Sequence, residues 1–178
     1  MAWALQAVCG ERDVVLATWD PFDAGDADKY YGTQLEHARF GTCSQPASVR
    51  RLFALISKLT PLGYLRRQLI FRRVRQMVAR SDFDVVLGVI DEMDVGVPAV
   101  QYVHFPLQED FVFAPGTRWH HRPFLIRVYR RLVGAIAPHS REGIAKNRTL
   151  VNSDWTGRHY AAIYGASAET VYPPVPGE

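Results

Sequence analysis

Short apolar runs of strand length alternate along this chain with segments whose apolar residues recur at helical spacing. The strand-length runs are residues 13–18, 84–90, 98–105, 149–152 and 170–172, and the helical segments are residues 3–9, 48–59, 62–80, 123–133, 141–146 and 154–164. The main runs hold few polar residues, which is typical of strands buried on both faces. This alternation predicts an α/β fold with a doubly wound parallel sheet.

Two other segments complete this assignment. Residues 24–47 carry Gly, Asp, Tyr and Thr without a clear period, so we expect an irregular segment with one short strand near residues 37–40. Ser153 stands where a helix N-cap belongs, and Gly165 stands where the helix over residues 154–164 should end. The proline-rich end of the chain predicts a domain over residues 1–172 and the start of a linker over residues 173–178.

The composition excludes several classes of protein. Of the 178 residues, 48% are hydrophobic, which is too many for a disordered or fibrous chain. No run reaches the roughly 18 apolar residues of a membrane span. The sequence has no glycine-rich phosphate loop and no serine nucleophile elbow, and its adjacent His120 and His121 lack the spacing of a metal pair. We therefore expect a cytoplasmic protein without a metal or a cofactor.

The charged residues are unevenly distributed, although the net charge is only +3. Seven acids and two bases lie in residues 1–36, whereas residues 37–81 hold ten bases and no acid. Such a basic block suggests an anionic partner, and its alternative is a solvated helical face. Nucleic acid is the weakest candidate for that partner, because the basic helix has no interleaved aromatic residues and the chain no recognised nucleic-acid motif.

Polar residues follow several of the predicted strands, at the edge where parallel sheets bind ligands. These candidates for a site are Asp20, Asp91, Glu92, His104, Asn152 and Ser153. His104 is the most informative of them, because it ends a buried run beside Pro106. Each also has an ordinary structural interpretation, as a loop residue, a hydrogen-bonded histidine or a helix cap. From the residues alone, the chain has a candidate ligand edge and no complete catalytic set.

Three strings of residues together resemble glycosyltransferase family 4. They are Tyr-Val-His-Phe-Pro at 102–106, Thr-Leu-Val-Asn-Ser-Asp-Trp-Thr-Gly at 149–157 and Val-Tyr-Pro-Pro-Val at 171–175. Within that family they are most similar to the branch of α-1,2-mannosyltransferases that extend lipid-linked oligosaccharides. The resemblance covers most of residues 84–178 and extends loosely over residues 1–83.

The resemblance implies a two-domain GT-B architecture, of which this chain would be the Rossmann-like, acceptor-side half. The family begins with a strand and a glycine-rich loop before its first helix, so the sheet is expected to lack its first strand here. A C-terminal domain that holds the nucleotide-sugar donor would also be absent, and we expect the chain alone to be inactive. By the same resemblance, His104 would position the acceptor or the transferred sugar, and Asn152 and Ser153 would lie at the start of a helix that faces the cleft. Together with Asp91 and Glu92, which follow another predicted strand, Asn152 and Ser153 are the residues expected to bind substrate.

The function implied is that of the acceptor-binding half of a hexosyltransferase. Such an enzyme moves a hexose, for which mannose is the favoured candidate, from a nucleotide sugar to a lipid-linked or other glycan acceptor. A lipid-linked acceptor also predicts peripheral attachment to the cytoplasmic face of an anionic membrane. The arginines expected to make that contact are Arg66, Arg67, Arg72, Arg73 and Arg75. The alternative is a non-catalytic module that binds the acceptor and the membrane without a donor domain.

Overall fold

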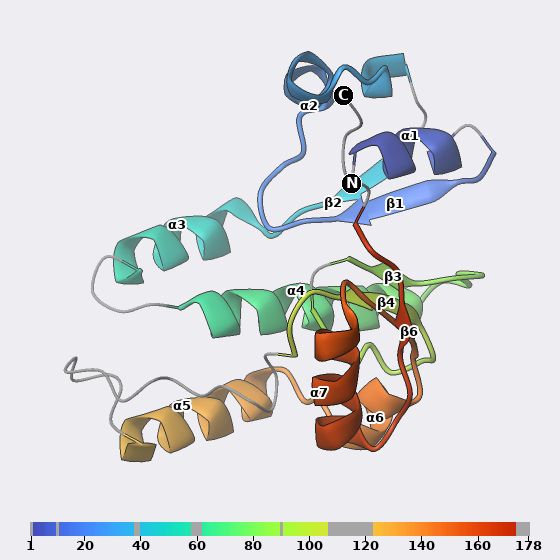
Figure 1. Ribbon diagram of the computed structural model, residues 1–178. Coiled ribbons are helices and arrows are strands. Elements are labelled where there is room, and N and C mark those ends of the chain that lie inside the picture. Colours follow the sequence, from blue (N-terminus) through green and yellow to red (C-terminus); the bar gives the residue numbers. More distant parts are fainter. Residues whose placement is uncertain are drawn as a thin grey trace. The chain divides into compact units, whose positions relative to one another are not determined.

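A computed structural model describes residues 2–9, 11–37, 40–57, 62–89, 91–106 and 123–173 of the chain (Figure 1). The chain divides into two compact units, residues 1–70 and residues 71–178, and we describe each by itself. Both units combine helices with parallel strands, which confirms the mixed α/β class predicted from the alternating pattern. The linker predicted after residue 172 falls mostly on residues 174–178, outside the described residues.

The first unit is built on a two-stranded parallel sheet. Strands β1 (Val14–Ala17) and β2 (Phe40–Cys43) pair in register from Val14 opposite Phe40 to Ala17 opposite Cys43. Around them lie α1 (Ala2–Cys9), α2 (Ala24–Tyr31), the short 3-10 helix η1 (Leu35–His37) and α3 (Ala47–Ile56). The positions of α1 and α3 agree with the helical spacing of the sequence to within a few residues.

Helix α2 corrects the expectation that residues 24–47 are irregular. The Asp23 side chain accepts a hydrogen bond from the Asp26 amide at its start, and Gly32, at φ 65°, ends the helix in the left-handed region. Beyond it, the Asp28 carboxylate accepts bonds from the Leu35 and Glu36 amides. The element is therefore stabilised by caps and a polar turn, and its few apolar residues leave no helical period to detect.

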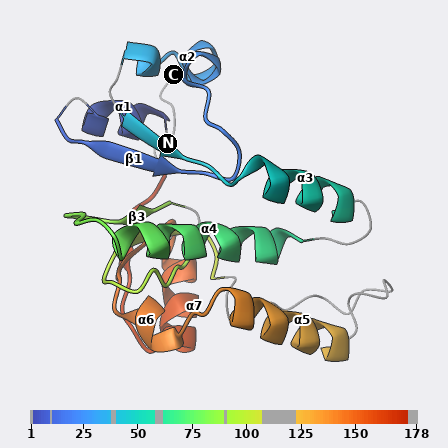
Figure 2. The ribbon, with the colours of Figure 1, turned by 180° about the vertical axis from the view of Figure 1, so that it is seen from behind.

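The second unit contains a four-stranded sheet, ordered β3-β4-β5-β6 and parallel throughout (Figures 1 and 2). Its strands are β3 (Leu87–Gly88), β4 (Val100–Val103), β5 (Arg148–Val151) and β6 (Glu169–Thr170). Its helices are α5 (Pro123–Ile136), α6 (Arg141–Ala145) and α7 (Asp154–Tyr164), and α4 (Gly63–Val78) runs into it from the first unit.

Burial of the strands differs from the expectation that both of their faces are covered. In β4, Gln101 and Val103 are buried while Val100 and Tyr102 are only partly buried, and β5 alternates in the same way. The first predicted strand of this unit shortens to two residues, of which Leu87 is 59% exposed. In this unit a continuous apolar run therefore indicates a strand, but it does not indicate that both faces of the strand are buried.

The buried face of the sheet is lined with polar side chains that bond one another. The side-chain amide nitrogen of Gln101 donates to the hydroxyls of Thr149 (2.9 Å) and Tyr160 (3.1 Å), and Tyr160 lies on α7. Asn147 donates to the Gln101 side-chain oxygen at 2.9 Å and accepts from the Ala99 amide at 3.0 Å. Because buried polar groups are costly unless bonded, this network fixes how α7 lies on the strands.

Candidate functional site

The ends of three neighbouring strands bring the central candidate residues together. Val103 of β4 is paired with Val151 of β5, and Val151 is paired with Thr170 of β6. The residues that follow, His104 and Asn152, therefore leave the sheet side by side at its carboxyl edge. The Asn152 amide donates to the Val103 carbonyl at 3.4 Å, which continues the strand pairing to the start of the site.

Thr156 ties the start of α7 to this edge. Ser153 is the N-cap, since its Oγ accepts from the Thr156 amide at 3.2 Å, as predicted from the sequence. The Thr156 hydroxyl lies 2.7 Å from Asn152 Oδ1 and 3.4 Å from the His104 carbonyl oxygen. The buried Thr156 hydroxyl thus connects the ends of β4 and β5 with the first turn of α7, and it holds the Asn152 side chain in place.

The imidazole of His104 stands out from this edge. The residue is exposed, and its ring meets the Tyr102 ring edge-on, with 5.1 Å between the ring centroids. The Tyr102 hydroxyl in turn donates to the Val171 carbonyl at 2.9 Å, and partial burial raises the pKa of Tyr102. Tyr102 therefore supports His104 from one side and links β4 to the segment that follows β6.

Three rings form a cluster beside these polar groups, which we call the aromatic cluster: Phe105, Trp155 and His159. The Trp155 ring stacks on Phe105 at 5.7 Å and on His159 at 5.3 Å, measured between centroids. Trp155 is nonetheless 55% exposed. None of the three is among the site residues predicted from the sequence, although Trp155 and His159 are four apart on a helix that begins at the ligand edge, a spacing that places them on one face.

Asp91 and Glu92 take a different place from His104. Both are buried, and Glu92 Oε1 accepts from the hydroxyl of Tyr164, the last residue of α7, at 2.9 Å. Tyr164 also packs against Tyr160, whose hydroxyl belongs to the polar network on the covered face of the sheet. Glu92 thus contacts the far end of the helix whose first turn borders His104.

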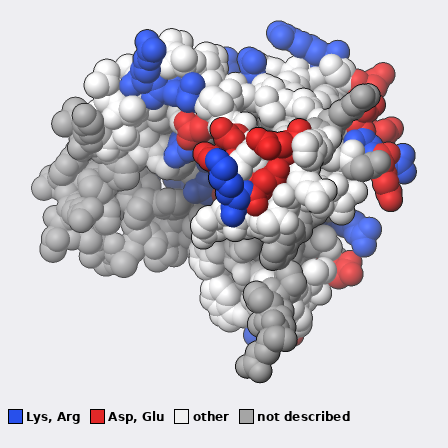
Figure 3. Space-filling view, turned by 90° about the horizontal axis from the view of Figure 1, so that it is seen from above, with Lys and Arg blue, Asp and Glu red and all other residues white. Residues whose placement is uncertain are grey.

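The arginines expected at a membrane have contacts within the chain. Arg66 lies 3.1 Å from an Asp20 carboxylate oxygen and 5.1 Å above the Trp19 ring. Arg72 donates to the Ile136 carbonyl at 2.9 Å. Arg67 and Arg73 also interact within the molecule. On the face drawn in Figure 3, acidic and basic side chains are intermingled.

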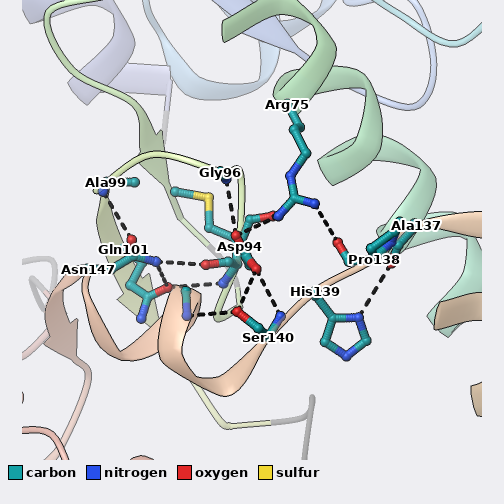
Figure 4. A network of polar contacts seen from close by, with 12 residues as sticks. Arg75, Asp94, Gly96, Ala99, Gln101, Ala137, Pro138, His139, Ser140 and Asn147 are labelled. Carbon is teal, nitrogen blue, oxygen red and sulfur yellow. Dashed lines mark hydrogen bonds and ion pairs between the residues drawn. The ribbon is translucent and has the colours of Figure 1, made fainter. Parts of the chain in front are cut away.

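Arg75 belongs to a second polar network, centred on Asp94 (Figure 4). Its guanidinium lies 2.6 Å from Asp94 Oδ1 and also donates to the Pro138 carbonyl at 2.9 Å. The other carboxylate oxygen of Asp94 accepts from the Ser140 amide at 2.8 Å. Burial by itself raises the pKa of Asp94, but the bonds from Arg75, Ser140 and Gly96 outweigh it and hold that pKa below its usual value.

No group of three or more His, Cys, Asp or Glu side chains is arranged to hold a metal ion in the described ranges. Among the helices of the same ranges, none has both the length and the apolarity to cross a bilayer.

Comparisons of the chain with protein-family models, with curated proteins and with solved structures find no match.

Proposed function

We propose that this chain is the acceptor-binding half of a GT-B glycosyltransferase. The whole enzyme would move a hexose, with mannose as the favoured candidate, from a nucleotide sugar to a lipid-linked or other glycan acceptor. The observation that carries the proposal is the convergence of His104, Asn152 and Ser153 with the aromatic cluster at the carboxyl edge of a parallel sheet. That edge is where open α/β sheets bind ligands.

The chemistry of the edge suits a sugar ring. A hexose has hydroxyl groups around its rim and an apolar face of C–H bonds, so it binds best where hydrogen-bonding groups border an exposed aromatic ring. Trp155 provides such a ring, and Asn152 and Ser153 lie three and two residues before it in the sequence. In the described part of the chain, neither ring nitrogen of His104 is hydrogen-bonded, which leaves the imidazole able to meet a hydroxyl.

In the proposed reaction the chain's residues position the acceptor. His104 would orient the attacking hydroxyl, and the face of Trp155 would hold the ring that carries it, because a transfer depends on keeping the reacting groups in one geometry. The Thr156 hydroxyl, at 2.7 Å from Asn152 Oδ1, would keep the amide directed at the ligand. The donor nucleotide sugar would be bound by a second domain, as the resemblance implies.

The test is binding of a manno-oligosaccharide to the full chain, measured by saturation-transfer NMR. We expect transfer to the sugar C–H protons, with a weakening of affinity of about fivefold in Trp155→Ala, since an aromatic stacking contact contributes about 1 kcal/mol. His104→Ala should weaken binding as well, because it removes a hydrogen-bonding group without touching the stack.

Tyr30→Ala is the matched control, because Tyr30 is also a highly exposed aromatic residue but lies on α2 in the other unit. This variant should bind as the unchanged chain does. Equal binding by the Trp155→Ala, His104→Ala and unchanged chains would contradict the assigned site. No transfer to any of a panel of oligosaccharides would contradict the function.

A further inference from the structure

We propose that helix α5 attaches this protein to an anionic lipid surface. The proposal is independent of the proposed function, because it rests on a different surface of the second unit and requires no sugar. It also assigns the membrane contact to a different helix from the arginine-rich segment 62–80 that the sequence analysis favoured.

The exposed residues of α5 follow one face of the helix. They are spaced three or four apart over its whole length, which is the period of a single helical face. They are Phe124, Arg127, Val128, Arg131, Leu132, Ala135 and Ile136. Four of them form an apolar stripe at intervals of four residues, and two of these, Phe124 and Leu132, are 70% and 60% exposed.

The opposite side of α5 holds the helix to the rest of the unit. Val133 is buried on that side, and Ala137 is buried just beyond the end of the helix. The Arg72 guanidinium donates to the Ile136 carbonyl at 2.9 Å and so satisfies one of the carbonyls that a helix end leaves free. The apolar stripe is therefore turned outward by contacts on its far side.

Charge decides which partner the stripe suits. Arg127 and Arg131 are four residues apart, so they lie one above the other and border the stripe along one side. The fourteen residues of α5 include no Asp or Glu. An apolar face bordered by arginines is the pattern of a helix that lies in the boundary of a bilayer, with its apolar side chains among the acyl chains and its cations at anionic headgroups.

The dimensions agree with attachment along the surface. A helix of fourteen residues is about 21 Å long, which is too short to cross the roughly 30 Å of a bilayer core. By contrast, Arg66, Arg72 and Arg75 of α4 already bind a carboxylate or a carbonyl within the chain. If these arginines bound lipid headgroups instead, the folded chain would lose the hydrogen bonds that they make.

The experiment is flotation of the full chain with lipid vesicles at low salt. Vesicles of phosphatidylcholine with about 30% phosphatidylserine should carry the protein, and vesicles of phosphatidylcholine alone should carry much less. Replacing both arginines, as Arg127→Gln with Arg131→Gln, should lower the partition coefficient about thirtyfold. Replacing the apolar residues, as Phe124→Ser with Leu132→Ser, should lower it at least tenfold on both kinds of vesicle.

Two variants serve as matched controls. Arg148→Gln removes an exposed arginine from β5, and Val85→Ser removes an exposed apolar residue outside α5. Both should float as the unchanged chain does, and circular dichroism checks that every variant is folded. Failure to bind anionic vesicles would overturn the proposal, and so would binding that the α5 changes leave intact.

A second copy of this chain is the competing occupant of the stripe. If the protein sediments as a dimer that Phe124→Ser with Leu132→Ser converts to a monomer, the stripe is a protein interface and the lipid proposal is wrong. Sugar binding at Trp155 is measured separately, so either proposal can fail while the other stands.

Discussion

At the scale of single residues, the buried Asp94 carboxylate connects parts of the chain that are far apart in the sequence. It accepts bonds from Arg75 on α4, from the Gly96 amide and from both the amide and the hydroxyl of Ser140 before α6. It thereby joins three segments at one point (Figure 4). The sequence could not predict this role, because the partners Arg75 and Ser140 are 19 and 46 residues away and nothing local marks the residue.

Asp94→Asn should lower the free energy of unfolding by about 2 kcal/mol at neutral pH, since it removes the charge from a buried hydrogen-bonded group. The pKa of Asp94 is lowered in the folded state, so its stabilising contribution is present above the unfolded value of about 3.9 and is lost as the pH falls through the folded value. Urea unfolding of both proteins from pH 7 to pH 3 measures this. A stability difference that stays constant into acid would contradict the assignment.

At the scale of the elements, the sequence predicts best those that carry both a period and a cap. Helix α7 has the Ser153 cap and the terminal Gly165 that were expected, and it spans Asp154–Tyr164 as predicted. Helix α2 is stabilised by caps and a polar turn alone, and the search for a period missed it. Strand β3 shrinks to two residues, because the apolar run around it lies largely exposed.

Two glycines give opposite predictions for an added methyl group. At Gly143 of α6 a Cβ would stand 2.8 Å from Asp94 Oδ1 and so would clash with this buried carboxylate. The carboxylate cannot move away without breaking its hydrogen bonds with Ser140 or Arg75. Gly143→Ala should therefore destabilise the protein by about 1–3 kcal/mol. At Gly134 of α5 a Cβ meets nothing within 4 Å, so Gly134→Ala should stabilise it by about 0.5–1 kcal/mol.

Thermal or urea unfolding of the two alanine variants, measured side by side, tests this pair. Equal effects at both positions would mean that the space around Asp94 is less restricted than the contacts indicate. Because the Gly134 change alters helix propensity alone, it also shows how large a backbone effect the same substitution has in this protein.

At the scale of the molecule, the alternating pattern is sufficient to predict the mixed α/β class and the parallel direction of the strands. The parallel order β3-β4-β5-β6 confirms both predictions. His104, Asn152 and Ser153 come together because parallel strands end at one edge, a consequence of topology that the sequence can predict. Glu92 instead contacts Tyr164, because the chain after β3 turns back along the covered face of the sheet. Such a reversal has no local signal.

The ligand edge itself is tested most directly by a titration of the isotope-labelled chain with a manno-oligosaccharide, followed residue by residue in its amide NMR spectrum. The account predicts shifts at residues 104–105 and 152–156 and at the indole N–H of Trp155, with the amides of α2 unchanged. Shifts confined to other parts of the chain, or none at millimolar sugar, would contradict the claim that the carboxyl edge of this sheet binds a glycan.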